Sequence, residues 1–166
     1  FYNSFSVGAQ LRYRTEENHT LYIEPRYAVD DRLVSVTAGL EYAMTEHRFH
    51  SSKRQPGEFT PHYTVGIAGG VNHLFLPAIY AGMPQLGAHV GMSGEYHFTP
   101  YSGFRMTLDY AQKANGMLYG GAARKYSVSH LNAGVDYMFD LSTLFAGYTP
   151  ERRLDVLLAA GPVLTP

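Results

Sequence analysis

The chain has 166 residues, of which 45% are hydrophobic and only 16% charged, and its formal net charge is −1. This length suits one domain with a core of its own, and the near-neutral charge excludes the basic footprint of a nucleic-acid-binding protein. No apolar run approaches the roughly 18 residues of a membrane helix, and the lack of cysteine excludes a disulfide scaffold.

Apolar and polar residues alternate along most of the chain. Such alternation is typical of β-strands, because successive side chains of a strand point to opposite faces of the sheet. The stretch from Leu131 to Phe139 is an example, since its odd-numbered residues are all apolar. No segment predicts a helix longer than a turn or two. In chain order, the alternation predicts strands over residues 4–13, 21–29, 34–44, 63–72, 88–98, 104–110, 127–139 and 153–161.

Charge is confined to one face of these predicted strands. Charged side chains can be buried inside a narrow barrel only when opposite charges pair, so we expect an interior charge network. Across the first hairpin we expect Arg12 to pair with Glu24, and across the "TPYSG" turn we expect Arg105 to pair with Glu95. The predicted network consists of Arg12, Glu24, Arg26, Glu41, Glu95, Arg105, Asp109 and Asp136.

The opposite face is apolar, with tyrosine and phenylalanine near the strand ends. Aromatic girdles at the two water interfaces are a feature of transmembrane barrels, whose outward residues meet lipid and whose inward residues are polar. A soluble barrel would place the same apolar face inside, and this alternative stays open. The residues predicted to face lipid include Leu108, Leu131, Ala133, Val135, Tyr137 and Phe139.

No catalytic, cofactor-binding or metal site is predicted. The chain has no cysteine nucleophile, phosphate-binding loop or zinc-binding His-Glu-x-x-His motif. His73 is interpreted as a strand-end residue rather than part of a lipid-modifying site. His89, His97 and His130 are interpreted as interior filling. A solvated loop is the interpretation for Glu46, His47, His50 and His62.

Two motifs carry a family resemblance. The stretch "NAGVDYMF", residues 132–139, resembles the Gly-x-x-Tyr-x-Phe strand pattern read by the outer-membrane assembly machinery. The run "VDYMFDLSTLFAGYTPERRLDVLLAAGPVL" is similar to the OmpA-type barrels of the Bacteroidota. The resemblance implies an antiparallel up-and-down transmembrane β-barrel in the bacterial outer membrane. It also implies a periplasmic turn over residues 141–153, in which Leu141, Leu144 and Phe145 pack on one another at the membrane rim.

The order of the family-like segments predicts a larger barrel than the eight visible strands. The segment from Val7 to Met44 resembles a part of the family pattern that normally comes after "LLAAGPVL", yet here it comes first. We therefore expect residues 1–44 to end one unit, 45–61 to connect, and 62–166 to begin a second. With the 141–153 turn in the periplasm, both chain ends would lie outside, so about ten or more strands are expected. The rival is an eight-stranded barrel that closes its first strand directly on its last.

These features predict a non-enzymatic integral outer-membrane barrel, structural or accessory to an outer-membrane assembly. Its expected partners are the lipid bilayer and lipopolysaccharide, with other outer-membrane proteins as further candidates, and no nucleic acid or cofactor. The glycine-rich segment 113–125 is expected to be an extracellular loop. A narrow pore, a soluble lipocalin-like ligand binder and a lipid-modifying enzyme are the alternatives.

Overall fold

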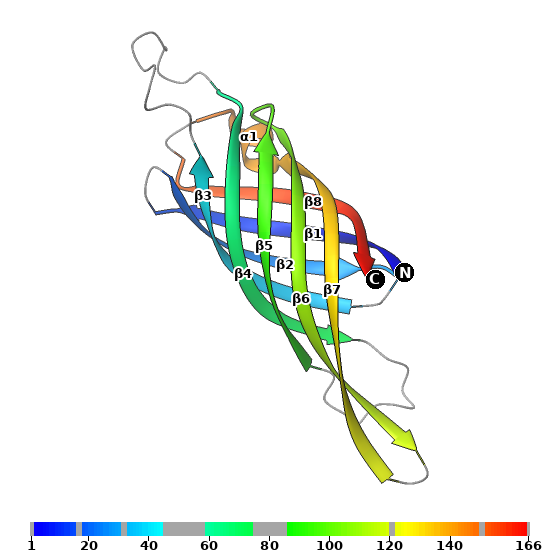
Figure 1. Ribbon diagram of the computed structural model, residues 1–166. Coiled ribbons are helices and arrows are strands. Elements are labelled where there is room, and N and C mark those ends of the chain that lie inside the picture. Colours follow the sequence, from blue (N-terminus) through cyan, green and yellow to red (C-terminus); the bar gives the residue numbers. More distant parts are fainter. Residues whose placement is uncertain are drawn as a thin grey trace.

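The chain forms a closed eight-stranded β-barrel (Figure 1). The computed structural model describes residues 2–15, 18–30, 33–44, 59–74, 86–119, 122–149 and 152–165. Each strand pairs antiparallel with the next, and the last pairs with the first. The elements are β1 (Tyr2–Arg14), β2 (His19–Ala28), β3 (Leu33–Met44), β4 (His62–Leu74), β5 (Leu86–His97), β6 (Ser102–Tyr119), β7 (Ala122–Asp140), α1 (Leu141–Ala146) and β8 (Leu154–Thr165).

The closure of the barrel contradicts the expectation of ten or more strands. β1 and β8 pair along their whole shared length, from Tyr2 opposite Thr165 to Tyr13 opposite Leu154. A strand has only two hydrogen-bonding edges, and here both edges of β1 and β8 are occupied, so no further strand fits between them. The rival eight-stranded closure is the one formed.

The division into two repeat-like units stays a prediction. β3 and β4, which flank the proposed connection, pair from Leu33 opposite Leu74 to Met44 opposite Tyr63. The strands on either side of residues 45–61 therefore belong to one barrel. Most of that connection, residues 45–58, lies outside the described residues.

The two ends of the barrel differ. Figure 1 shows both chain termini close together, at what we call the terminal end. The β2–β3, β4–β5 and β6–β7 connections lie at this end as well, because the strands alternate in direction. The other three β–β turns and α1 lie at the opposite end, which we call the helix end.

The β6–β7 hairpin extends beyond the barrel wall. β5 pairs with β6 only as far as Gln112, and the β7–β8 pairing begins at Ala133, yet β6 and β7 pair on to Tyr119 and Ala122. The prediction of a loop over residues 113–125 is therefore wrong. Glycines suggested a loop, but Gly116 is accommodated within the ladder opposite Lys125.

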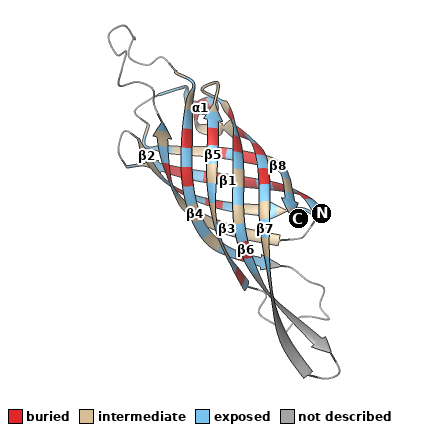
Figure 2. Ribbon diagram, viewed as in Figure 1, coloured by how far each residue is buried: buried red, intermediate tan, exposed pale blue. Residues whose placement is uncertain are grey.

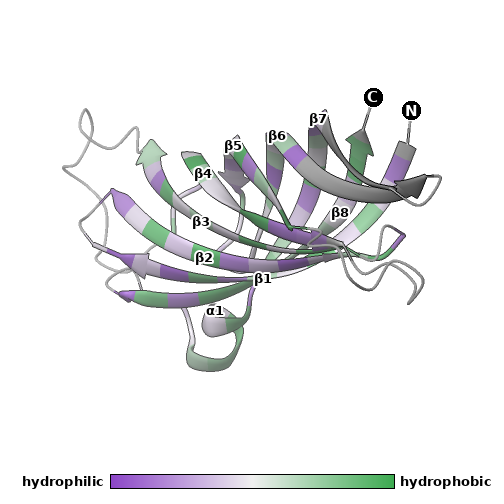
Figure 3. Ribbon diagram, turned by 90° about the horizontal axis from the view of Figure 1, so that it is seen from below, coloured by the Kyte–Doolittle hydropathy of each residue, from purple (hydrophilic) through white to green (hydrophobic). Residues whose placement is uncertain are grey.

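The barrel is polar inside and apolar outside. Figure 2 shows buried and exposed residues alternating along the strands, and Figure 3 shows hydrophilic and hydrophobic residues alternating likewise. Ile67, Met106 and Val90 are at least 60% exposed, whereas Glu41, Glu95 and Asp136 are at most 2% exposed. This arrangement is the reverse of a soluble domain, in which large apolar side chains fill the interior.

A proline interrupts one ladder of the sheet. The β1–β2 register is broken where Ala9 lies opposite Pro25 and Gln10 lies opposite Glu24. Proline has no N–H to donate, so a gap in the ladder is expected at this position. The β2–β3 register continues through Pro25, which lies opposite Val36.

The short helix α1 closes the connection between β7 and β8. Asp140 caps it, because its Oδ1 atom accepts a hydrogen bond from the Thr143 backbone N–H at 2.9 Å. Leu144 and Phe145 are 50% and 82% exposed, so the predicted self-packing of this apolar cluster is wrong. Within the described segments, no helix is long and apolar enough to cross a membrane.

Candidate functional site

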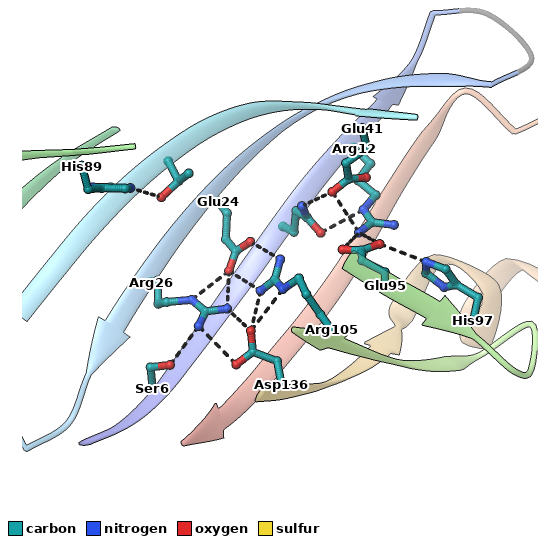
Figure 4. Close-up of polar contacts among 12 residues, drawn as sticks. Ser6, Arg12, Glu24, Arg26, Glu41, His89, Glu95, His97, Arg105 and Asp136 are labelled. Carbon is teal, nitrogen blue, oxygen red and sulfur yellow. Dashed lines mark hydrogen bonds and ion pairs between the residues drawn. The ribbon is translucent and has the colours of Figure 1, made fainter. Parts of the chain in front are cut away.

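Four predicted interior residues form a compact ion-pair cluster, which we call the terminal-side cluster (Figure 4). Arg105 on β6 contacts Glu24 on β2 at 2.6 Å and Asp136 on β7 at 2.9 Å. Arg26 on β2 contacts Asp136 at 2.6 Å and Glu24 at 2.8 Å. Two arginines thus face two carboxylates, and the cluster is charge-balanced. Ser6 adds a hydroxyl that accepts a hydrogen bond from Arg26 at 2.9 Å.

A second set, the helix-side cluster, lies nearer α1 and contains Arg12, Glu41 and Glu95 (Figure 4). The Arg12 guanidinium donates to both Glu95 oxygens at 2.7 Å and to Glu41 at 3.2 Å. Gln10 bridges the group, because its amide donates to Glu41 at 3.0 Å and its carbonyl accepts from Arg12 at 2.8 Å. His97 contacts Glu95 at 3.0 Å.

The predicted pairs are not the pairs formed by these residues. Arg12 binds Glu41 and Glu95 rather than Glu24. Arg105 is the register partner of Glu95, yet its side chain binds Glu24 and Asp136. Both predictions assumed contacts between neighbouring strands, whereas long side chains in this narrow barrel reach across the interior.

The two clusters separate two interior chambers. The terminal chamber, about 120 Å³, is lined by residues such as Arg26 and Arg105, and the helix-end chamber, also about 120 Å³, by residues such as Arg12. Among the described residues, no side chain lines both chambers. Gln10, Glu95 and Asp136 line neither and are at most 2% exposed. We call the two clusters together with Gln10 the polar plug.

Asp109 does not join the predicted network. It forms no ion pair or hydrogen bond with another described residue, and its side chain lines the terminal chamber. Its register partner on β5 is Gly91, and a Cβ atom at that glycine would collide with the Asp109 carboxylate. The carboxylate therefore lies against the barrel wall at Gly91 and is not part of the terminal-side cluster.

The residues predicted to face lipid point away from the interior. Leu131, Val135 and Tyr137 are each 47% exposed, and Leu108 is 42% exposed. Ala133 is exposed as well, whereas Phe139 is only half-exposed. The structure thus places these side chains on the outer surface.

The interior histidines take part in separate contacts. His89 shares a hydrogen bond with Thr37 at 2.8 Å, and His62 stacks on His97 with ring centroids 4.8 Å apart. In the described part of the chain, no three His, Asp or Glu side chains gather as a metal site would require. Glu46, His47 and His50 lie outside the described residues.

Sequence reasoning missed two structural members of the interior. Gln10 is at an even-numbered position of β1, which the alternation assigns to the inward face, so its place in the interior could have been predicted from the sequence. Tyr22 is 6% exposed, and a Cβ atom at Gly39, its register partner, would collide with its ring. A tyrosine at an inward-facing position, opposite a glycine on the next strand, is the sequence feature that could have predicted this contact.

Comparison with known proteins assigns no family, because no family model and no curated protein matches the chain. The similarity to OmpA-type barrels therefore depends on the quoted motifs alone. It stays a prediction, and the function has to be argued from the geometry.

Proposed function

We propose that this chain is an integral β-barrel of the bacterial outer membrane without catalytic activity, structural or accessory to an outer-membrane assembly. The observation that carries the proposal is the inverted distribution of polarity. Large apolar side chains such as Ile67 and Met106 are exposed on the outside, while ionised pairs fill the interior. Lipid would remove the apolar surface from water, and bilayer lipid and lipopolysaccharide are the proposed contacts.

The soluble alternative fits this distribution poorly. A lipocalin-like barrel holds its ligand in an interior lined by apolar side chains. Here the few buried apolar residues, such as Met138 and Leu157, share the interior with arginines and carboxylates. The exposed apolar residues of the outer wall would then have to be covered by something other than water.

The polar plug favours a structural role over an open pore. Its fully buried members lie between the two chambers, so an ion would have to displace paired charges in order to pass. A narrow pore remains the second candidate, since the chambers approach the plug from both ends. In a planar bilayer, we expect little or no steady conductance from the purified barrel, and a stable open channel would favour the pore.

Membrane residence is tested by fractionation. Expressed with an outer-membrane targeting signal, the chain is expected in the membrane fraction, resistant to carbonate extraction and solubilised by detergent. Folded barrels of this kind run faster in unheated than in heated gels, and the same mobility shift is expected here. A folded protein that stays soluble without detergent would contradict the proposal.

The orientation is tested by cysteine labelling, because the chain has no cysteine of its own. The β6–β7 hairpin and the α1 connection lie at opposite ends of the barrel, and we propose that the hairpin is extracellular. A membrane-impermeant reagent should then label Gly116→Cys on intact cells. Thr149→Cys should react only after permeabilisation. Labelling of Thr149→Cys alone on intact cells would reverse the orientation.

A further inference from the structure

The projecting part of the β6–β7 hairpin is a ribbon of only two strands, seen at the lower right of Figure 1. The pairing of β5 with β6 ends at Gln112, and the pairing of β8 with β7 begins only at Ala133. The ladder between β6 and β7 nevertheless continues to Tyr119 opposite Ala122. Within the described part of the chain, each strand of this ribbon therefore has one paired edge and one open edge.

The open edge of β7 extends from Ala122 to Ser129, and no described strand other than β6 pairs with this stretch. In an antiparallel ladder, alternate residues direct their N–H and C=O groups to opposite sides, so about half of these groups point away from β6. An open edge of this kind is a template for a further strand. At about 3.3 Å per residue, the edge is roughly 25 Å long, which is within the usual length of a β-strand.

The sequence of the hairpin is basic. Between Asp109 and Asp136 it contains no acidic residue and three basic residues, Lys113, Arg124 and Lys125. Their register partners are a valine, a methionine and a glycine, none of which is acidic. Opposite charges on facing strands stabilise a sheet, and like charges destabilise it. The β7 edge therefore disfavours a second copy of the same basic strand and favours an acidic one.

We propose that the β7 edge of this hairpin binds an extended acidic segment of a partner protein, which adds to the ribbon as a further strand. Backbone hydrogen bonds supply the affinity in this mode of recognition, and the side chains of the two strands supply the specificity. The proposal does not depend on the membrane location, because the hairpin projects past the barrel wall in detergent and in a bilayer alike. It agrees with an accessory role in an assembly, since a partner bound there leaves the barrel wall intact.

The test titrates the peptide fluorescein-Thr-Glu-Val-Glu-Val-Glu-Thr-amide with the folded, purified chain in detergent and follows fluorescence polarisation. Saturable binding is expected. The same peptide with lysine in place of glutamate should not bind, because its charge repels that of the hairpin. Two further peptides keep the negative charge and are N-methylated at one or the other set of alternate residues. One of them should lose binding and the other should keep it, because only one edge of an added strand pairs with β7.

Charge reversal locates the binding site on the hairpin. Lys125→Glu should weaken binding of the acidic peptide by roughly fivefold or more, because an attractive pair of charges on facing strands becomes repulsive. Arg153→Glu is the matched control, since it makes the same change of charge at an exposed residue just before β8, at the helix end of the barrel. Its affinity for the peptide should equal that of the unaltered chain. Equal affinity in the Lys125→Glu variant would contradict a site on the hairpin.

Three further results would overturn the proposal. The first is the absence of saturable binding by the unaltered chain. The second is equal binding of both N-methylated peptides, which would indicate attraction of any polyanion, lipopolysaccharide included, without strand pairing. The third is sedimentation of the unaltered chain as a dimer that the peptide does not dissociate, because a second copy would then occupy the edge. None of these results would bear on the membrane location, which fractionation tests separately.

Discussion

Replacement of Arg105 by methionine is expected to lower the free energy of unfolding by about 3–5 kcal/mol, the largest effect of any single change proposed for the interior. Arg105 is 2% exposed and makes ion pairs with both Glu24 and Asp136. Methionine keeps much of the apolar volume of the arginine stem but none of its charge. Arg26 would remain as the single cation facing two buried carboxylates, so one negative charge would be left without compensation.

The measurement is urea unfolding of the barrel in lipid vesicles, followed by tyrosine fluorescence because the chain has no tryptophan. Arg152→Met is the matched control. Arg152 also pairs with an aspartate, Asp155, but at 3.5 Å and with a partly exposed side chain, so a loss of at most about 1 kcal/mol is expected. Similar losses of unfolding free energy in the two variants would contradict a requirement for charge balance in the buried network.

A second substitution separates the charge imbalance from the loss of packing. Adding Asp136→Asn to Arg105→Met removes the uncompensated carboxylate, so part of the lost stability should return. A coupling free energy of roughly 0.5–3 kcal/mol is typical for residues in one ion-pair network. Strictly additive losses in the double variant would contradict a direct interaction between the two side chains.

Parity along the strands predicts which side chains face inward, because the side-chain period of a strand is two residues and leaves no choice of face. Glu24, Glu41 and Asp136 could be assigned to the interior for this reason. Their partners could not be predicted in the same way. Arg12 and Glu95 lie on β1 and β5, 83 residues apart in the chain, and meet because the barrel is narrow enough for side chains to cross it. A local sequence pattern carries no information about a contact between residues so far apart in the chain.

Strand number was mispredicted for a related reason. The contact that decides it, between Tyr2 on β1 and Thr165 on β8, joins the two ends of the described chain. The periplasmic assignment of the 141–153 turn and the order of the family-like segments rest on local features, and they indicated a larger barrel. The extent of β6 and β7 was underestimated because Gly116 and its neighbours suggested a loop, although two strands paired with each other can continue past the barrel wall.

Substitution of an outward-facing residue by arginine tests the proposed membrane location, because the change in the free energy of unfolding depends on whether the outer wall faces lipid or water. Val135 is 47% exposed on β7, and its register partner on β6 is the outward Met106, which is 67% exposed. If this surface faces lipid near the bilayer midplane, Val135→Arg should cost about 2–4 kcal/mol, because the guanidinium would be moved from water into hydrocarbon. On a water-exposed surface the same change would be within about 0.5 kcal/mol of neutral. The two environments therefore predict clearly different results.

Asn132→Arg is the matched control, since Asn132 is on the same strand with the opposite parity and lines the terminal chamber. An arginine there would enter a polar interior that contains the Asp109 carboxylate, so a smaller loss than for Val135→Arg is expected. Both variants are compared by reversible unfolding in the same vesicles, and unheated gels verify that each has folded. A larger loss for Asn132→Arg than for Val135→Arg, or equal losses, would contradict a lipid-facing outer wall. A Val135→Arg variant with an almost unchanged free energy of unfolding would also contradict a lipid-facing outer wall, whatever the result for the control. Such a result is expected only if the arginine side chain is exposed to water.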